Sequence, residues 1–186
     1  MAGSELGGYD YTLVWAFCGH LGGRMHTTLI FQLLVLLVVA NGAPVLVKKA
    51  LGDQLAQPFD GGAVLPDGRP LFGPSKTVRG ILSSFLATAL AALLMGFQWE
   101  VGALVAGGAV AGDLFSSFVK RRLGFAPSSM AIGLDQIPES LFPLAACRLL
   151  LPVTFVDILV GVAIFVAGGL ILSPILFRLH LRDTPY

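Results

Sequence analysis

The sequence has 186 residues, of which 55% are hydrophobic and only 12% are charged. Soluble globular domains carry about 25% charged residues, so this composition excludes an ordinary soluble domain and indicates an integral membrane protein. The net charge of +1 argues against a protein that binds nucleic acid through a broad basic surface. Two cysteines, Cys18 and Cys147, are too few for a disulfide framework or a zinc site.

Five apolar windows are long enough to cross a ~30 Å hydrocarbon core as helices. The sequence therefore predicts an all-α integral membrane protein with about five transmembrane helices, at Thr28–Val47, Gly80–Phe97, Val101–Val119, Met130–Leu151 and Val153–Leu176. Three residues separate the second window from the third, and about one residue, Pro152, separates the fourth from the fifth. Both short connections predict helical hairpins that turn on one side of the membrane, opposite two longer polar loops.

Basic residues gather on the side of the long loops. Ten lysines and arginines fall in residues 48–79, in residues 120–129 or near the C-terminus, and only Arg24 and Arg148 fall on the other side. The positive-inside rule then makes 48–79 and 120–129 cytoplasmic loops, with the C-terminus in the cytoplasm and the N-terminus outside. Aromatic residues in 1–26 favour an N-terminal interfacial segment, and the chain from 1 to 186 is expected to form a single transmembrane domain.

A stripe of polar residues begins inside the third window. Asp113 lies several residues deep in this window, behind a run of glycine and alanine, and ionisable side chains at such depth usually face a cavity. Ser116, Ser117 and Lys120 follow at i+3, i+4 and i+7, so that all four side chains share one helical face. The stripe predicts a functional surface or, alternatively, a purely structural row of ion pairs.

Two further carboxylates share a face near the cytoplasmic end of the fourth window. Asp135 and Glu139 are four residues apart, and nearby prolines should kink or open this helix. Together with Asp113 they would form a hard oxygen-ligand set suited to Mg²⁺ or Mn²⁺ and not to zinc. The alternative is that Asp135 and Glu139 pair with Lys120 or Arg121 for structure alone.

The first long loop ends in a segment suited to phosphate. Ser75, Lys76, Thr77 and Arg79 provide two hydroxyls and two cations just before a predicted helix, where free N–H groups and the helix dipole favour an anion. The spacing is not that of a Walker loop, and a basic turn that anchors the membrane surface would explain the segment equally well. Asn41 either presents an amide where the first helix breaks or marks only the end of that helix.

Three motifs taken in order resemble the CTP-transferase family of membrane enzymes. They are Ser-Lys-Thr-Val-Arg-Gly at 75–80, the segment 112–124 that begins with Gly-Asp and ends with Lys-Arg-Arg-Leu-Gly, and Leu-Asp-Gln at 134–136. The phosphatidate cytidylyltransferases of this family have a G-D-x-x-x-S-x-x-K-R segment followed by L-D-R-x-D. Here Pro138 replaces the second aspartate and Glu139 follows it. The absence of that group's histidine-glycine-glycine segment matches the branch that acts on archaeol-type lipids.

The resemblance implies a cytidylyltransferase that transfers CMP from CTP to a membrane lipid phosphate, such as 2,3-di-O-geranylgeranylglyceryl phosphate, and releases pyrophosphate. It implies that Asp113, Lys120 and Asp135 are catalytic, and that Asp113, Asp135 and Glu139 hold Mg²⁺ or Mn²⁺. The groups expected to bind CTP and its phosphates are Ser75, Lys76, Thr77, Arg79, Ser116, Ser117, Arg121 and Asn41.

These implications describe a multi-pass protein of the cell membrane whose active site faces the cytoplasm. Its expected partners are CTP, the lipid phosphate and the bilayer, with no nucleic acid. A CDP-diacylglycerol synthase that acts on phosphatidate is the second interpretation. A small proton-coupled transporter ranks third, because the odd number of spans, the lack of an inverted repeat and the phosphate-type loop argue against it.

Overall fold

The computed structural model describes residues 25–126, 129, 131 and 133–178, with the side chains of the last helix described as far as residue 171. The regular structure of this part of the chain is helical, apart from two isolated β-bridges in one loop, and the all-α prediction is confirmed. The predicted interfacial segment 1–26 lies almost wholly outside the described residues. The helices are α2 (Thr27–Leu51), α3 (Val78–Leu94), α4 (Trp99–Arg122), α5 (Gln136–Cys147) and α6 (Phe155–Arg178).

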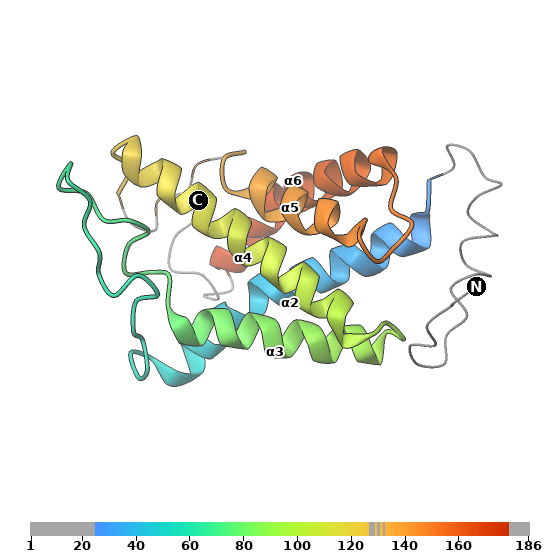
Figure 1. The fold of residues 1–186 in the computed structure, drawn as a ribbon, viewed down its shortest axis with the longest axis horizontal. Coiled ribbons are helices and arrows are strands. Elements are labelled where there is room, and N and C mark those ends of the chain that lie inside the picture. The colour runs from blue at the N-terminus through green and yellow to red at the C-terminus, as the bar shows by residue number, and fades with distance from the viewer. Residues whose placement is uncertain (1–24, 127–128, 130, 132, 179–186) are drawn as a thin grey trace, which may run out of the picture.

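The helices run along the long axis of the molecule, so that their connections gather at its two ends (Figure 1). The α2–α3 loop, residues 52–77, lies at one end together with the C-terminal end of α4. The α3–α4 and α5–α6 connections lie at the opposite end. This arrangement confirms the prediction that the short connections share one side and face the longer loops on the other.

The fourth helix is shorter than predicted at both ends. The window Met130–Leu151 was expected to be helical, but α5 contains only the 12 residues Gln136–Cys147, about 18 Å at 1.5 Å per residue. Gly133 adopts a φ of 82°, outside the helical range, and holds the chain in a turn before the helix. Leu151 precedes Pro152, which disfavours helical backbone there. Residues 148–154 therefore connect α5 to α6, in place of the single predicted residue.

The two long loops are displaced relative to the prediction, because the helices before them continue further. α2 extends to Leu51 and α4 to Arg122, so the loops begin at residues 52 and 123 instead of 48 and 120. Asn41 neither breaks α2 nor ends it, contrary to both alternatives. The predicted bounds of the second and third windows otherwise agree with α3 and α4 to within three residues.

A side chain from α3 compensates for a proline inside α2. Pro44 has no N–H to donate to the carbonyl four residues earlier, which belongs to Ala40. The Ser84 hydroxyl of α3 donates a hydrogen bond of 2.8 Å to this buried oxygen. Without this contact, α2 would expose an unpaired carbonyl inside the bundle, where such a group is costly. The proline therefore allows a polar contact between two apolar helices.

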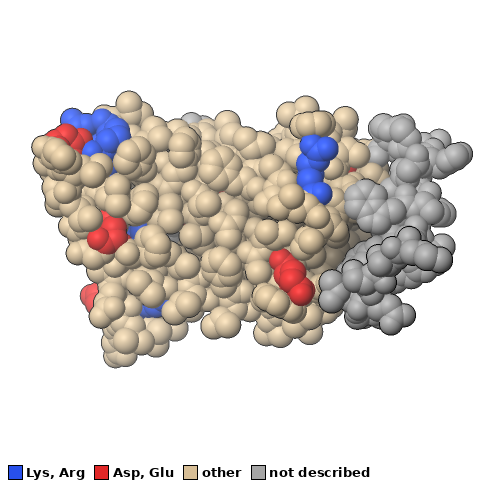
Figure 2. All heavy atoms as spheres, viewed as in Figure 1, with Lys and Arg blue, Asp and Glu red and all other residues tan. Residues whose placement is uncertain are grey.

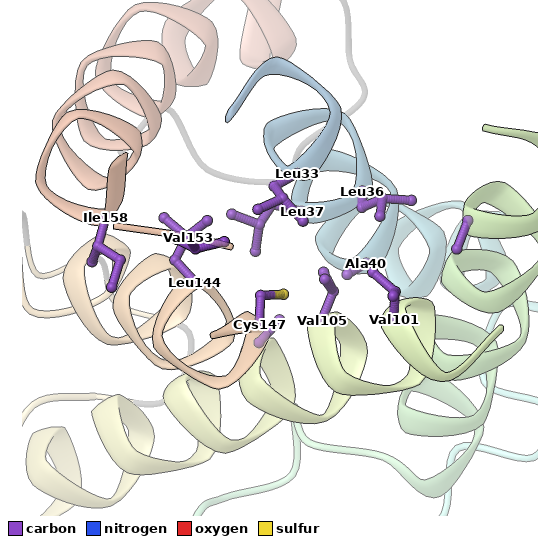
Figure 3. Close-up of a cluster of buried hydrophobic side chains, with 12 residues drawn as sticks. Leu33, Leu36, Leu37, Ala40, Val101, Val105, Leu144, Cys147, Val153 and Ile158 are labelled. Atoms are coloured by element: carbon purple, nitrogen blue, oxygen red, sulfur yellow. The ribbon is translucent and has the colours of Figure 1, made fainter. Parts of the chain in front are cut away.

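The buried core lies between α2, α4, α5 and the start of α6 (Figure 3). Its members are mainly aliphatic and come from segments far apart in the sequence, with Cys147 of α5 facing the same interior. Core residues labelled in the figure include Leu33, Leu36, Leu37, Val101, Val105, Leu144, Val153 and Ile158.

The outer faces of the helices are apolar as well. Leu82, Leu86 and Leu90 repeat every four residues along α3, and all three are exposed. Uncharged surface covers the middle of the face seen in Figure 2, while charged side chains cluster at the end that carries the long loop. Apolar surface of this extent is expected where a protein meets a membrane. Within the described chain α2 and α4 are long and apolar enough to cross one, whereas α3 and the stretch 155–171 of α6 are apolar but shorter.

Glycines in α4 allow α5 to approach it closely. A Cβ atom added to Gly112 would lie 2.2 Å from the carbonyl oxygen of Pro138, and one added to Gly108 would lie 2.4 Å from the Cα atom of Pro143. Real Cβ atoms do not come so near to backbone atoms, so no larger side chain fits at either position without moving one of the helices. The two glycines therefore fix the distance between α4 and α5.

At the end opposite the long loops, His26 joins the start of α2 to the start of α6. Asp157 is 1% exposed and accepts hydrogen bonds from the backbone N–H of His26 at 2.9 Å and of Thr154 at 2.9 Å. Its second contact with His26 is to Nδ1 of the ring at 2.8 Å. The Thr154 hydroxyl in turn accepts from the Asp157 N–H, which completes a capping box at the start of α6.

The glycine contacts predict different effects for two similar substitutions in α4. Gly112→Ala places a methyl group against the backbone of α5, and overpacking of this kind costs ~1–3 kcal/mol, so we expect Tm in detergent to fall by roughly 2–12 °C. Gly107→Ala is the matched control, because its Cβ would lie 3.5 Å from the Phe85 ring, an ordinary contact. Equal Tm values for the two variants would contradict the close packing described.

Candidate active site

Lys76 and Asp113 form the first pair of charges at the polar end of the bundle. The Lys76 ammonium lies 2.6 Å from each oxygen of the Asp113 carboxylate. Lys76 comes from the end of the α2–α3 loop and Asp113 from α4, so the pair joins two predicted motifs. Thr77 fixes the position of Lys76, because its hydroxyl accepts a hydrogen bond from the Gly80 N–H and caps α3.

Asp60 orders the loop that carries Lys76. One carboxylate oxygen accepts hydrogen bonds from the N–H groups of Phe72 at 3.0 Å and Gly73 at 3.4 Å, and the other accepts from Gly62 at 3.0 Å. Burial raises the pKa of the Asp60 carboxyl, but these hydrogen bonds outweigh the effect, and the pKa lies below its ordinary value of 3.8. The Phe59 N–H also donates to the Lys76 carbonyl at 2.7 Å.

Glu139 brings a second carboxyl to Asp113. It lies in the first turn of α5, within hydrogen-bonding reach of the Asp113 side chain and close enough to Lys76 for electrostatic interaction. The backbones of Gly112 and Pro138 are in close contact. Asp113 directly follows Gly112 and Glu139 directly follows Pro138, so the contact brings the two carboxyls together. The structure thus unites Asp113 and Glu139, which the sequence placed together in one ligand set.

Lys120 and Asp135 form the second pair of charges. The Lys120 ammonium lies 2.7 Å from Asp135 Oδ1 and donates to the carbonyl of Ser129 at 2.9 Å. The other oxygen of Asp135 accepts from the Ala131 N–H at 2.9 Å. The structure therefore contains the ion pair between Asp135 and Lys120 that the sequence raised as an alternative to a metal-binding role for this carboxylate. Lys120 is nearly buried, so its charge is held by partners from the following loop.

Arginines fasten the α2–α3 loop to the end of α4. Arg122 forms an ion pair with Asp67 and donates to the carbonyls of Arg69 at 3.2 Å and Pro70 at 2.6 Å. In return, Arg69 donates to the carbonyls of Arg121 at 3.3 Å and of Arg122. These reciprocal contacts satisfy carbonyls at the C-terminus of α4, which have no partner within the helix. No sequence motif marks Arg69 or Asp67 as a site residue, although the Asp-Gly pairs at 60–61 and 67–68 signal turns.

Several residues predicted to bind phosphate have other partners in the structure. Arg79 donates to backbone carbonyls of Gly52, at 2.6 Å, and Gln54, so it braces the chain just after α2. The Ser116 hydroxyl is buried and donates to the Asp113 carbonyl at 3.0 Å. Thr77 caps α3, as described above. Whether these three also bind phosphate stays a prediction.

The remaining predicted residues lie in three different settings. Ser75 is exposed next to Lys76, and Ser117 is buried in α4. Asn41 is half-buried in α2, and its side-chain N–H₂ group has no hydrogen-bond partner among the described residues. Arg121 is buried at the end of α4, where it donates to the carbonyl of Ala126 at 2.8 Å. Their role in nucleotide binding stays a prediction.

The carboxylates of the site are oxygen ligands of the kind that Mg²⁺ takes. In the chain as described, no three histidine, cysteine, aspartate or glutamate side chains are grouped so that they could hold a metal. Asp113 and Glu139 are adjacent, and each aspartate is also paired with a lysine, Asp113 with Lys76 and Asp135 with Lys120. Mg²⁺ is commonly bound by one or two carboxylates together with substrate phosphates. The Asp113–Glu139 pair suits that arrangement, and the predicted set of three ligands is not assembled here.

Comparisons with known proteins point to one enzyme family. A family model described as CarS-like, CDP-archaeol synthase, matches residues 96–186. The chain is 33% identical to the CDP-archaeol synthase of Hyperthermus butylicus, over 77% of this chain and 80% of that protein. It is 41% identical to the enzyme of the same description from Aeropyrum pernix, over 58% of this chain and 62% of that protein.

One solved structure, described as an intramembrane enzyme for archaeal membrane lipid biosynthesis, shares the fold. It is 35% identical, has a TM-score of 0.62, and the match covers 76% of this chain and 90% of that one. This chain thus shares its fold with a protein described as an intramembrane enzyme. The chain belongs to the CDP-archaeol synthase family, and the family resemblance seen in the sequence is confirmed.

The lowered pKa of Asp60 predicts how acid affects the loop. A carboxyl whose folded-state pKa is depressed stabilises the structure above its ordinary pKa, and this contribution is lost as the pH falls through the folded-state value. Hydrogen–deuterium exchange of residues 58–77, corrected for intrinsic rates, should accelerate as the pH falls below the ordinary carboxyl pKa of 3.8. Asp60→Asn should show fast exchange already at neutral pH, and Asp53→Asn, an exposed control in the same loop, should not. Exchange independent of both pH and Asp60 would refute this role.

Proposed function

We propose that this protein transfers CMP from CTP to the phosphate of an isoprenoid ether lipid of the 2,3-di-O-geranylgeranylglyceryl phosphate type. The products are a CDP-archaeol-type lipid and pyrophosphate. One observation carries the proposal: a member of the CDP-archaeol synthase family holds Lys76–Asp113 and Lys120–Asp135 side by side with Glu139 at the polar end of an apolar bundle. This position lets a water-soluble nucleotide meet a phosphate that is anchored in the bilayer.

The reaction is a phosphoryl-group displacement that needs no covalent enzyme intermediate. An oxygen of the lipid phosphate attacks the α-phosphorus of CTP, and the bond from that phosphorus to the bridging oxygen of the β-phosphate breaks. Pyrophosphate carries away the electron pair. Catalysis then rests on alignment of the two substrates and on neutralisation of their charges.

The lysines of the site supply the neutralising charge. Lys76 and Lys120 are each held within 2.7 Å of a carboxylate, so their ammonium groups are positioned before substrate arrives. The phosphate oxygens of CTP are competing acceptors for these same ammonium groups. Mg²⁺ bound to Asp113 and Glu139 would draw negative charge from the phosphates and stabilise the leaving pyrophosphate. Asp135 keeps Lys120 oriented towards the site through its ion pair.

The proposal also includes the orientation of the protein in the cell membrane. The five helices form a multi-pass bundle with the N-terminus outside, the C-terminus in the cytoplasm and the active site facing the cytoplasm. Support comes from the excess of lysine and arginine in and around the loop 52–77 and the end of α4. CTP therefore reaches the site from the compartment where nucleotides are made.

Membership of the family favours one of the three functions that the sequence raised. The curated relatives are described as CDP-archaeol synthases, which favours an ether lipid phosphate over phosphatidate. A proton-coupled transporter is not supported, because the relatives and the structural neighbour are described as enzymes. The ion pairs of the site, which could also serve transport, are therefore assigned to catalysis.

Transfer of label from CTP to lipid tests this function directly. Purified protein in detergent with Mg²⁺ and α-labelled CTP should move label into the lipid phase with digeranylgeranylglyceryl phosphate, and far more slowly with diacyl phosphatidate. Sealed vesicles with the loop 52–77 outward should use external CTP, whereas vesicles of the opposite orientation should not. Absence of lipid label with either substrate would overturn the proposed activity.

The charge of Asp113 is required if it helps to hold the metal and Lys76. Asp113→Asn keeps the shape of the side chain but removes its charge, so we expect kcat/KM to fall by at least about 100-fold while the protein still folds. Asp53→Asn removes an exposed carboxylate from the neighbouring loop and should retain full activity. Turnover of Asp113→Asn close to the parent value would exclude this aspartate from the site.

A further inference from the structure

The turn that follows α2, residues 52–56, contains a leucine in a strained conformation. Leu55 has a φ of 55°, and among the residues that the structure describes it is the one position other than glycine with a positive φ. The Cβ atom of an L-residue is crowded in this left-handed region, where glycine and asparagine are the usual occupants. Backbone geometry alone therefore does not account for a leucine at this position.

Packing does not account for it either, because the side chain of Leu55 is 75% exposed. Exposed apolar side chains also occur on the two helices next to the turn, at Leu46 and Leu51 of α2 and at Leu82 of α3. The outer faces of these helices carry the apolar surface that is expected to meet the membrane. The turn thus presents a further apolar group at the end of that surface.

Arg79, in the first turn of α3, holds the turn in place. It donates hydrogen bonds to the carbonyl of Gly52, at 2.6 Å, and to that of Gln54. The Gln54 N–H in addition donates to the Leu51 carbonyl at 3.0 Å. A strained residue persists only where its surroundings determine its conformation, and these contacts fix the backbone directly before Leu55. Figure 1 shows the start of the loop beside the start of α3, whereas the middle of the loop extends beyond the helix ends.

The chain that leaves this turn is hydrogen-bonded to the segment that carries Lys76. The Phe59 N–H donates to the Lys76 carbonyl at 2.7 Å, and the Val78 N–H donates to the Gln57 carbonyl at 3.0 Å. The two segments run antiparallel to each other. Gln57 follows Leu55 by two positions, so a movement of Leu55 is transmitted to the backbone of Lys76 through a short, hydrogen-bonded path.

We propose that the Leu55 side chain inserts into the membrane leaflet at the polar end of the bundle and thereby holds the segment of Lys76 at the lipid surface. Lys48 and Lys49, in the last turn of α2, provide cations of the kind found where a helix leaves a membrane. Leu55 is a positioning residue, because it acts on Lys76 through the backbone. The positioning of Lys76 rests on the proposed cytidylyltransferase function, whereas the insertion of Leu55 does not.

Quenching of a tryptophan at position 55 by brominated lipids tests the insertion. The native tryptophans are first removed as Trp15→Phe and Trp99→Phe. In nanodiscs, Leu55→Trp should then lose most of its fluorescence to lipids brominated near the headgroup end of their chains. Val64→Trp is the matched control, because Val64 is 61% exposed in the middle of the same loop. Quenching at position 55 that is no stronger than at position 64 would overturn the insertion.

Leu55→Asn tests the positioning role, because asparagine adopts the left-handed conformation more readily than leucine. The turn is therefore retained, and Tm in detergent should stay equal or rise. Without the membrane contact, kcat/KM for the lipid phosphate in bilayers should fall by about tenfold, the scale expected when one leucine side chain leaves an apolar layer. Leu55→Met should restore the parent value. Val64→Asn, the matched control, should keep it throughout.

A purely structural role for Leu55 predicts a different order of activities. It would make Leu55→Asn at least as active as the parent, because asparagine relieves the strain, and that result would refute the positioning of Lys76. If the parent protein does not label lipid from CTP, the proposed function fails and the positioning role fails with it. The quenching experiment still decides the insertion in that case, because it does not depend on turnover.

Discussion

The close contact between α4 and α5 is the constraint on which the site depends. Because Gly108 and Gly112 have no side chains, the backbone of α5 lies directly against α4 at Pro143 and Pro138. The carboxyls of Asp113 and Glu139 meet as a consequence of this contact. A wider spacing between the helices would separate Asp113 on α4 from Glu139 on α5, and the two carboxyls would not form a shared site. Packing and chemistry are therefore set by the same residues.

Charge balance explains how such a site is stable at the edge of an apolar bundle. Two lysines face two aspartates, and each pair joins two different segments of the chain. Ionised groups near a hydrocarbon layer are costly unless they are paired. The pairs thus serve two purposes: they hold the loops to the helices, and they keep cations in place for an anionic substrate. Arg69 and Arg122 extend the same pattern to the end of α4.

The helices were largely predictable from the sequence, because apolar windows bounded by polar loops leave few alternatives in a membrane. The prediction failed for the fourth window, because the apolar sequence begins before the turn at Gly133 and continues beyond the end of α5 at Cys147. The stripe from Asp113 to Lys120 was recognised because helical spacing is local. The pairing of Lys120 with Asp135 was one of the alternatives raised by the sequence. The partner of Asp113 was not predicted, since the pairing of Lys76 with Asp113 spans 37 residues and depends on how the loop folds. For Arg79 the motif gave no sign of its contacts with the carbonyls of Gly52 and Gln54, which also depend on how the loop folds.

The contact between His26 and Asp157 has a consequence for biogenesis. These residues are 131 positions apart, and they join the start of α2 to the start of α6. During synthesis α2 enters the bilayer long before α6 leaves the ribosome, so the buried face of α2 stays incomplete until the last helix is inserted. The bundle therefore closes late, and a nascent chain that ends before α6 leaves a membrane-embedded intermediate on which insertases and quality-control proteases can act.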